Sequence, residues 1–160
     1  MTDDARPVVV AYDGSEPACA AVRAAADLFP DGRIVVVTVW EAGLALATAE
    51  NRQFTGMGNA MPGPDEWAAV DRAQRDHAAE AAAQGVQLAA EAGVTAEACS
   101  LEDEHGVART IATYAEGCDA RAVVVGSRGI GGMRARVFGS TSRGVLERAD
   151  RPVVVVKAPG

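Results

Sequence analysis

Lysine is almost absent from this chain. Among 160 residues the only lysine is Lys157, and 15 basic residues stand against 22 acidic ones, which gives a formal net charge of −7. Proteins that bind nucleic acid or anionic lipid present a basic face to it. The sequence therefore argues against a nucleic acid and against a membrane surface as partners.

Cysteines and long apolar runs are also scarce. The three cysteines, Cys19, Cys99 and Cys118, are odd in number and widely spaced, and no CxxC pair occurs. This pattern predicts reduced, half-buried thiols and excludes a disulfide framework or a zinc site. No apolar run approaches the roughly 18 residues of a membrane-spanning helix, and no secretory signal pattern opens the chain. We therefore expect a cytoplasmic protein.

Aromatic residues make up only 4% of the chain, whereas apolar residues, many of them alanine, make up 49%. Small side chains favour close packing of helices against a sheet over an aromatic-rich core. The charged fraction of 23% is ordinary for a globular protein. At this length we expect one domain over residues 1–160.

Apolar strands alternate with amphipathic helices along the chain. The strands are expected at residues 7–12, 34–40, 94–101, 122–125 and 152–157. The helices are expected from the N-cap Ser15 to Phe29 and over residues 65–92, 106–116 and 140–149. Strands that are apolar on both faces are typical of a parallel sheet covered on both sides. The sequence therefore predicts an α/β fold with a doubly wound five-stranded parallel sheet, in which the more polar strand 94–101 lies at an edge.

Two segments carry more specific expectations. The long helix 65–92 is expected to bury one side, formed by Val70, Ala73, His77, Ala81, Gln84, Leu88 and Ala92. The segment from Glu41 to Pro64 is broken by glycine and proline, so we expect a long loop with at most a helical turn or two. Its Phe54, Met57 and Met61 are equally compatible with covering a ligand and with packing on the neighbouring surface.

A glycine-rich loop joins the strand 122–125 to the helix that begins near Ser140. Such a loop lets backbone N–H groups turn toward a ligand, and a helix N-terminus adds unpaired donors, so the combination suits a phosphate. Four arginines form a local basic cluster in this otherwise acidic chain: Arg128, Arg134, Arg136 and Arg143. The alternative is a surface loop whose glycines only make turns.

The common phosphate-binding motifs do not fit this loop. A P-loop needs a lysine after its glycines, and a GxGxxG fingerprint begun at Gly129 would need glycine where Arg134 stands. The loop instead has Gly126, two residues, Gly129, nine residues, and then Gly139-Ser140. This spacing, the string GSRGIGGM and the ending Pro152-Val153-Val154-Val155-Val156 resemble the ATP-binding branch of the universal stress protein family. The resemblance covers nearly the whole chain apart from residues 41–64.

The resemblance implies an adenine nucleotide alpha hydrolase-like fold with strand order 3-2-1-4-5, helices on both faces, and a nucleotide between the first and fourth strands. The residues it implies as contacts of ATP, ADP or AMP are Asp13, Val39, Gly126, Gly129, Gly139 and Ser140. By position, their expected neighbours in the site are Ala11, Tyr12, Ser127, Arg128, Thr141 and Ser142. Any Mg²⁺ is expected to be bound through the phosphates, because no carboxylate cluster for a dedicated metal site is visible.

The sequence is compatible with three functions. The first is an ATP-binding regulatory protein of the stress response, with slow hydrolysis at most, since no catalytic constellation can be placed and His77 and His105 are expected far from the loop. The second is an ATP-hydrolysing or adenylating enzyme of the same fold, although such enzymes carry SGGxDS where this chain has DGSEP. The third is a dimeric scaffold that binds no nucleotide.

The last strand predicts a homodimer. Val153 to Val156 are four consecutive valines, and in the implied strand order they lie at the outside of the sheet. An exposed apolar edge of this kind pairs readily with another chain. A two-fold partner that presents the same strand would satisfy both edges at once.

Overall fold

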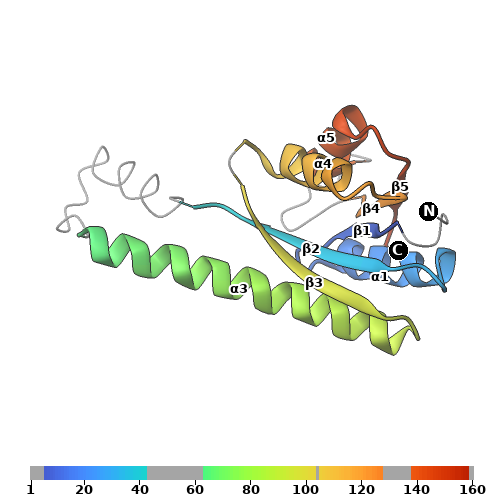
Figure 1. Ribbon diagram of the computed structural model, residues 1–160, viewed down its shortest axis with the longest axis horizontal. Helices are drawn as coiled ribbons and strands as arrows, with labels where there is room; N and C mark the ends of the chain where they lie inside the picture. The colour runs from blue at the N-terminus through green and yellow to red at the C-terminus, as the bar shows by residue number, and fades with distance from the viewer. Residues whose placement is uncertain (1–5, 43–62, 104, 128–137, 159–160) are drawn as a thin grey trace.

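The computed structural model describes residues 6–42, 63–103, 105–127 and 138–158 of the chain. Five parallel strands form one sheet of order β3-β2-β1-β4-β5, as predicted (Figure 1). The strands are β1 (Val8–Ala11), β2 (Ile34–Trp40), β3 (Ala96–Glu102), β4 (Ala122–Gly126) and β5 (Val153–Val156). All but β3 form where β-branched residues run together, and the sequence placed each of the five strands to within two residues at either end.

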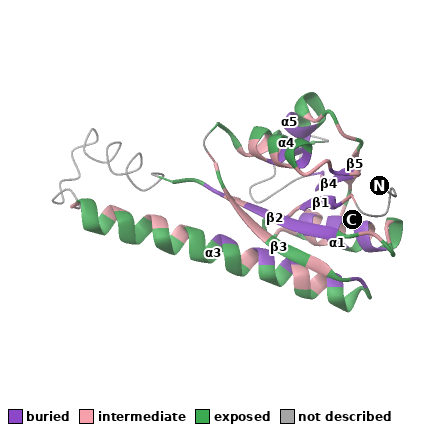
Figure 2. Ribbon diagram, in the orientation of Figure 1, coloured by how far each residue is buried: buried purple, intermediate pink, exposed green. Residues whose placement is uncertain are grey.

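Helices cover both faces of the sheet (Figure 1). They are α1 (Glu16–Leu28), α3 (Pro64–Glu91), α4 (Val107–Gly117) and α5 (Ser140–Arg148). Helices α1 and α3 share one apolar cluster with the sheet, and α4 and α5 share the other. Because both faces are covered, the central strands β1, β2 and β4 are almost continuously buried (Figure 2). The polar strand β3 lies at an edge, which confirms the prediction.

The predicted buried side of α3 was wrong. Val70, His77 and Gln84 are exposed, and the helix instead buries the alanine-rich side formed by Ala78, Ala82, Gly85 and Ala89. A Cβ at position 85 would lie 2.6 Å from Val36 Cγ1, so Gly85 lets the helix approach the sheet closely. An alanine-rich helix offers several apolar sides, and the sheet has selected the one with the smallest side chains.

The amino-terminal half of α3 behaves differently from its carboxy-terminal half. All four fully buried positions lie from Ala78 onward, whereas the earlier turns are exposed or half-buried (Figure 2). One contact of the earlier part is made by Arg75, whose guanidinium lies 5.4 Å from the centroid of the buried Trp40 ring. Residues 43–62, with the predicted helical turns and with Phe54, Met57 and Met61, lie outside the described residues.

Two further expectations concern composition. Cys19, Cys99 and Cys118 are all free and half-buried, as predicted. Within the described ranges, no helix is both long enough and apolar enough to cross a membrane.

Candidate functional site

The chain changes direction at the centre of the sheet. β1 and β4 are hydrogen-bonded neighbours, yet β1 leads into α1 on one face and β4 leads toward α5 on the other (Figure 1). In open α/β sheets, ligands bind beyond the carboxyl ends of the strands at such a reversal. The fold therefore brings the residues around Asp13 and those around Gly126 to one place, although more than a hundred positions separate them in sequence.

A tight turn follows β1. Gly14 has a positive φ of 79°, and the Ser15 N–H donates to Asp13 Oδ1 at 3.0 Å. The Ser15 hydroxyl in turn accepts from the Ala18 N–H at 3.3 Å, so Ser15 is the N-cap of α1, as predicted. These bonds hold the Asp13 side chain on the turn at the sheet reversal, where Asp13 is exposed.

The Tyr12 side chain belongs to the core. It is 7% exposed, lies in the cluster under α1 and α3, and its hydroxyl lies 3.7 Å from Cys19 Sγ. Burial, together with the bond to Cys19, raises the pKa of Tyr12 to about 12. Tyr12 can therefore contribute only its backbone to the site, and its phenol stays neutral at physiological pH.

Gly126 ends β4 beside the first turn of α1. A Cβ at this position would lie 2.6 Å from the Pro17 carbonyl carbon and 2.7 Å from its oxygen. Real Cβ atoms do not approach backbone so closely, so this glycine is needed for α1 to pack on the sheet, whatever it does for a ligand.

The two ends of the glycine loop are tied together at its base. The Ser127 carbonyl accepts from the Gly139 N–H at 2.6 Å and from the Ser142 hydroxyl at 3.1 Å. The same hydroxyl lies 3.1 Å from the Gly139 carbonyl, and the Ser127 N–H donates to the Val156 carbonyl at 2.7 Å. Ser127 and Ser142 are both buried, so this bridge is protected from water. It fixes the start of α5 against the end of β4.

Helix α5 begins without a side-chain cap. Its N-cap is Gly139, which has no side chain to accept from the first turn of the helix. Ser140 is exposed and Thr141 is half-buried, so both hydroxyls are available at the helix start, while that of Ser142 is used inside the loop base. Unpaired N–H groups and hydroxyls at a helix N-terminus suit an anion. The predicted Arg128 and Gly129 lie outside the described residues.

Val39 lies near the end of β2, on the other side of β1. It is half-buried, and it extends two residues beyond Val37, which is the partner of the last β1 residue, Ala11. The candidate site thus has three walls: the end of β2, the Asp13 turn, and the β4–α5 junction.

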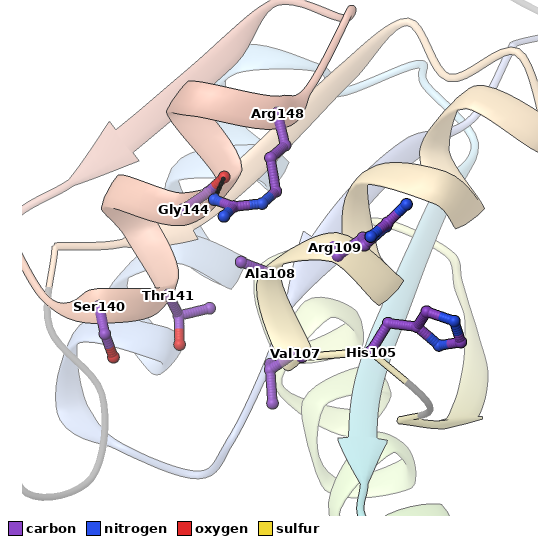
Figure 3. Close-up of a pocket in the computed structure, with 9 residues that line it drawn as sticks. His105, Val107, Ala108, Arg109, Ser140, Thr141, Gly144 and Arg148 are labelled. Carbon is purple, nitrogen blue, oxygen red and sulfur yellow. Dashed lines mark hydrogen bonds between the residues drawn. The ribbon is translucent and has the colours of Figure 1, made fainter.

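A cavity of about 320 Å³ adjoins the α5 wall, between the first turn of α4 and one side of α5 (Figure 3). It is lined by His105, Gly106, Val107, Ala108, Arg109, Ser140, Thr141, Gly144 and Arg148. The prediction that His105 lies far from the loop residues was therefore wrong, since His105 lines the same cavity as Ser140 and Thr141. Its imidazole nevertheless points away from α5 (Figure 3). His77 is exposed on α3.

Sequence reasoning missed what supports these walls. Thr38 is buried and its hydroxyl donates to the Tyr12 carbonyl at 2.9 Å, but a threonine within an apolar strand gives no signal of such a contact. Asp103 holds the start of α4 by accepting from the N–H groups of His105 and Gly106. Across the described parts of the chain, no group of three or more histidine, cysteine or carboxylate side chains could hold a metal ion.

The sheet order and the site at its reversal define an α/β protein with the adenine nucleotide alpha hydrolase-like fold. The profile of the universal stress protein family matches residues 5–157, and the chain belongs to that family. No curated protein matches the chain by sequence.

Solved structures with the same fold cover almost the entire chain. A universal stress protein from Archaeoglobus fulgidus is 25% identical, with a TM-score of 0.66 over 95% of this chain and 98% of that one. A universal stress protein from Archaeoglobus fulgidus in complex with dAMP is 23% identical, with a TM-score of 0.64 over 96% of this chain and 99% of that one. A universal stress protein family protein from Arabidopsis thaliana with AMP bound is 18% identical, with a TM-score of 0.59 over 97% and 93%.

Proposed function

We propose that this chain is a nucleotide-binding regulatory protein of the stress response, which holds ATP between the Asp13 turn and the Gly126–Ser142 loop. The observation that carries the proposal is the junction at the sheet reversal, where Ser127 ties the end of β4 to the uncapped start of α5. Phosphates would lie against the N–H groups and hydroxyls of Ser140 and Thr141 at the start of α5. The ribose would lie beside the Asp13 carboxylate, which can accept from its hydroxyls.

The comparisons support the adenine nucleotide as the ligand class. The relatives from Archaeoglobus fulgidus and Arabidopsis thaliana carry dAMP and AMP, and this chain shares their fold and family. We propose ATP, accompanied by Mg²⁺ held through the phosphate oxygens, over ADP and AMP. The basic cluster predicted around Arg128 favours the larger negative charge of a triphosphate.

Thermal unfolding with nucleotide tests the proposal. MgATP at about 100 times its dissociation constant should add roughly 2.7 kcal/mol to the free energy of unfolding, because the ligand binds only the folded chain. ADP and AMP at equal concentration should give smaller shifts, and inorganic tripolyphosphate separates recognition of the nucleoside from binding of an anion. If none of the three nucleotides raises the melting temperature, the chain is not a nucleotide-binding protein.

The Asp13→Ala variant tests whether the Asp13 carboxylate binds the ribose. It should weaken the binding of ATP while leaving the smaller stabilisation by tripolyphosphate unchanged, because Asp13 belongs to the turn after β1, whereas the proposed phosphate contacts belong to the start of α5. Glu16→Ala is the matched control, since Glu16 is an exposed carboxylate three residues further along the same segment. If stabilisation by ATP and by tripolyphosphate fell equally, Asp13 would not be a contact of the ribose.

We also propose that the protein is a homodimer joined through β5. Its four valines are all half-buried in the single chain, and β5 is an outer strand of the sheet. Pairing with a second copy would bury them and complete the hydrogen bonds of the edge.

A further inference from the structure

The hydrogen-bond ladder between β1 and β2 stops one rung early. The Val8 N–H donates to the Arg33 carbonyl at 2.8 Å, and the Tyr12 N–H donates to the Val37 carbonyl at 2.8 Å. In this parallel register the next rung would join the Val39 N–H to the Tyr12 carbonyl. That rung is not formed, because the paired residues end at Ala11 and Val37.

A side chain takes the place of the missing rung. The Thr38 hydroxyl donates to the Tyr12 carbonyl at 2.9 Å, and Thr38 is only 7% exposed. Since a buried carbonyl without a partner is costly, this bond lets β1 leave the sheet after Tyr12 without an energetic penalty. The carbonyl no longer needs the Val39 N–H.

The missing rung leaves the backbone groups of Val39 without their partner on β1. Alternate residues of a strand turn their backbone groups to the same side, and Arg33 and Val37 both face β1. The N–H and C=O of Val39 therefore face the same side, at a level where β1 has already turned away through Asp13 and Gly14. Figure 1 shows β2 continuing past the end of β1. A donor and an acceptor thus stand side by side in the wall of the candidate site.

This pair matches one kind of base. The six-membered ring of adenine presents an amino donor next to a ring-nitrogen acceptor, whereas guanine and hypoxanthine present an oxo acceptor next to an N–H donor. With the ribose held in one place, the orientation of the ring is fixed. The Val39 N–H and C=O can then each form a hydrogen bond with the edge of adenine. With guanine or hypoxanthine, the same two groups would meet a donor with a donor and an acceptor with an acceptor.

We propose that Thr38 is the positioning residue for base selection: by bonding the Tyr12 carbonyl it keeps the Val39 N–H and C=O open for the edge of adenine. This inference rests on the proposed nucleotide site and adds the residue that makes it selective. Thr38 itself touches no ligand. It acts through the backbone of its neighbour.

Three variants and two nucleotides test the proposal. Thr38→Val keeps the shape of the side chain and removes the hydroxyl, so the Tyr12 carbonyl recruits the Val39 N–H and the donor is lost to the ligand. Thr38→Ser retains the hydroxyl. Thr110→Val is the matched control, because the Thr110 hydroxyl bonds Asp103 at the start of α4 instead.

Affinity for ATP and for ITP, which differ only at the reading edge, is measured for each protein by calorimetry. The wild type should prefer ATP by about tenfold or more, since each lost hydrogen bond is worth about that factor. Thr38→Val should bring the ATP/ITP ratio close to one while tripolyphosphate binding stays unchanged. Thr38→Ser and Thr110→Val should keep the wild-type ratio.

Amide hydrogen exchange gives a second readout that needs no nucleotide. In the free wild type the Val39 N–H should exchange much faster than the Val37 N–H, and in Thr38→Val it should become protected. A protected Val39 N–H in the wild type would overturn the inference. So would an unchanged ATP/ITP ratio in Thr38→Val when the wild type binds ATP, which leaves the proposed function standing; a wild type that binds no nucleotide overturns both.

Discussion

At the scale of single residues, glycines in this chain are placed where two elements meet. Gly85 lets α3 approach Val36, and Gly126 lets α1 approach the end of β4. Gly144 does the same between α5 and α4, since a Cβ there would lie 2.6 Å from Ala108 Cβ. None of these three has a positive φ, so close packing and not backbone conformation explains them. A glycine within the family's loop motif can therefore serve the fold as well as the ligand.

The Gly126→Ala variant should measure this role. The added methyl group would overlap the Pro17 backbone, so we expect the free energy of unfolding to fall by about 1–3 kcal/mol, the usual cost of overpacking. Gly117→Ala is the control, because a Cβ at the end of α4 meets nothing within 4 Å. It should be neutral or slightly stabilising.

Urea denaturation of the two variants and the wild type checks the difference. Equal stabilities would show that the start of α1 yields to the extra methyl group at no cost. This measurement must come before any binding experiment on Gly126, because lost affinity in an unstable variant says nothing about phosphates.

At the scale of elements, the start of α4 is organised by a residue outside the helix. Asp103 Oδ1 accepts from the His105 N–H at 3.0 Å, from the Gly106 N–H at 2.6 Å and from the Thr110 hydroxyl at 2.9 Å. The N-cap, Gly106, has a φ of 106° and no side chain of its own to cap the helix. A carboxylate also interacts favourably with the positive end of the helix dipole.

Asp103→Ala should therefore destabilise the protein by about 1–2 kcal/mol, as for the loss of an N-cap. Glu102→Ala is a fitting control, because Glu102 is the exposed neighbouring carboxylate at the end of β3. Thermal unfolding of both variants distinguishes them. If Glu102→Ala lowered the stability as much as Asp103→Ala, the effect would come from the loss of a negative charge and not from the loss of the cap.

At the scale of the whole molecule, β5 is an outer strand, and in the described part of the chain no strand pairs with its far edge. The Val123 N–H donates to the Pro152 carbonyl and the Ser127 N–H to the Val156 carbonyl. Even-numbered positions of β5 therefore turn their backbone groups toward β4, and the groups of Val153 and Val155 face the open edge. The proposed dimer would be held through those two residues.

Val155→Pro should break the dimer while preserving the sheet within each chain, because it removes an N–H from the open edge only. Val154→Pro is the contrasting variant, since it removes an N–H that faces β4 and should destabilise the chain itself. Sedimentation of the wild type and Val155→Pro at micromolar concentration checks the prediction. A monomeric wild type would end the proposal, and a dimer that survives Val155→Pro would place the interface elsewhere.

The sequence by itself determined the elements of this protein. Runs such as Val8–Ala11 and Ile34–Trp40 are β-branched and apolar, and the N-cap Ser15 starts α1, so these features follow from residues that are close together in the chain. The exposed position of β3 also followed from its own polarity. Local preference and local burial pattern are sufficient for such predictions.

Only the tertiary structure decided how the elements meet. The strand order came from family resemblance, because pairing joins segments far apart in sequence and the apolar pattern of each strand is compatible with several orders. The buried side of α3, the inward turn of Ser142 and the cavity that brings His105 near Ser140 all depend on partners from other elements. The bond from Thr38 to the Tyr12 carbonyl is of the same kind: it joins residues 26 positions apart, and it exists because β1 leaves the sheet there while β2 continues.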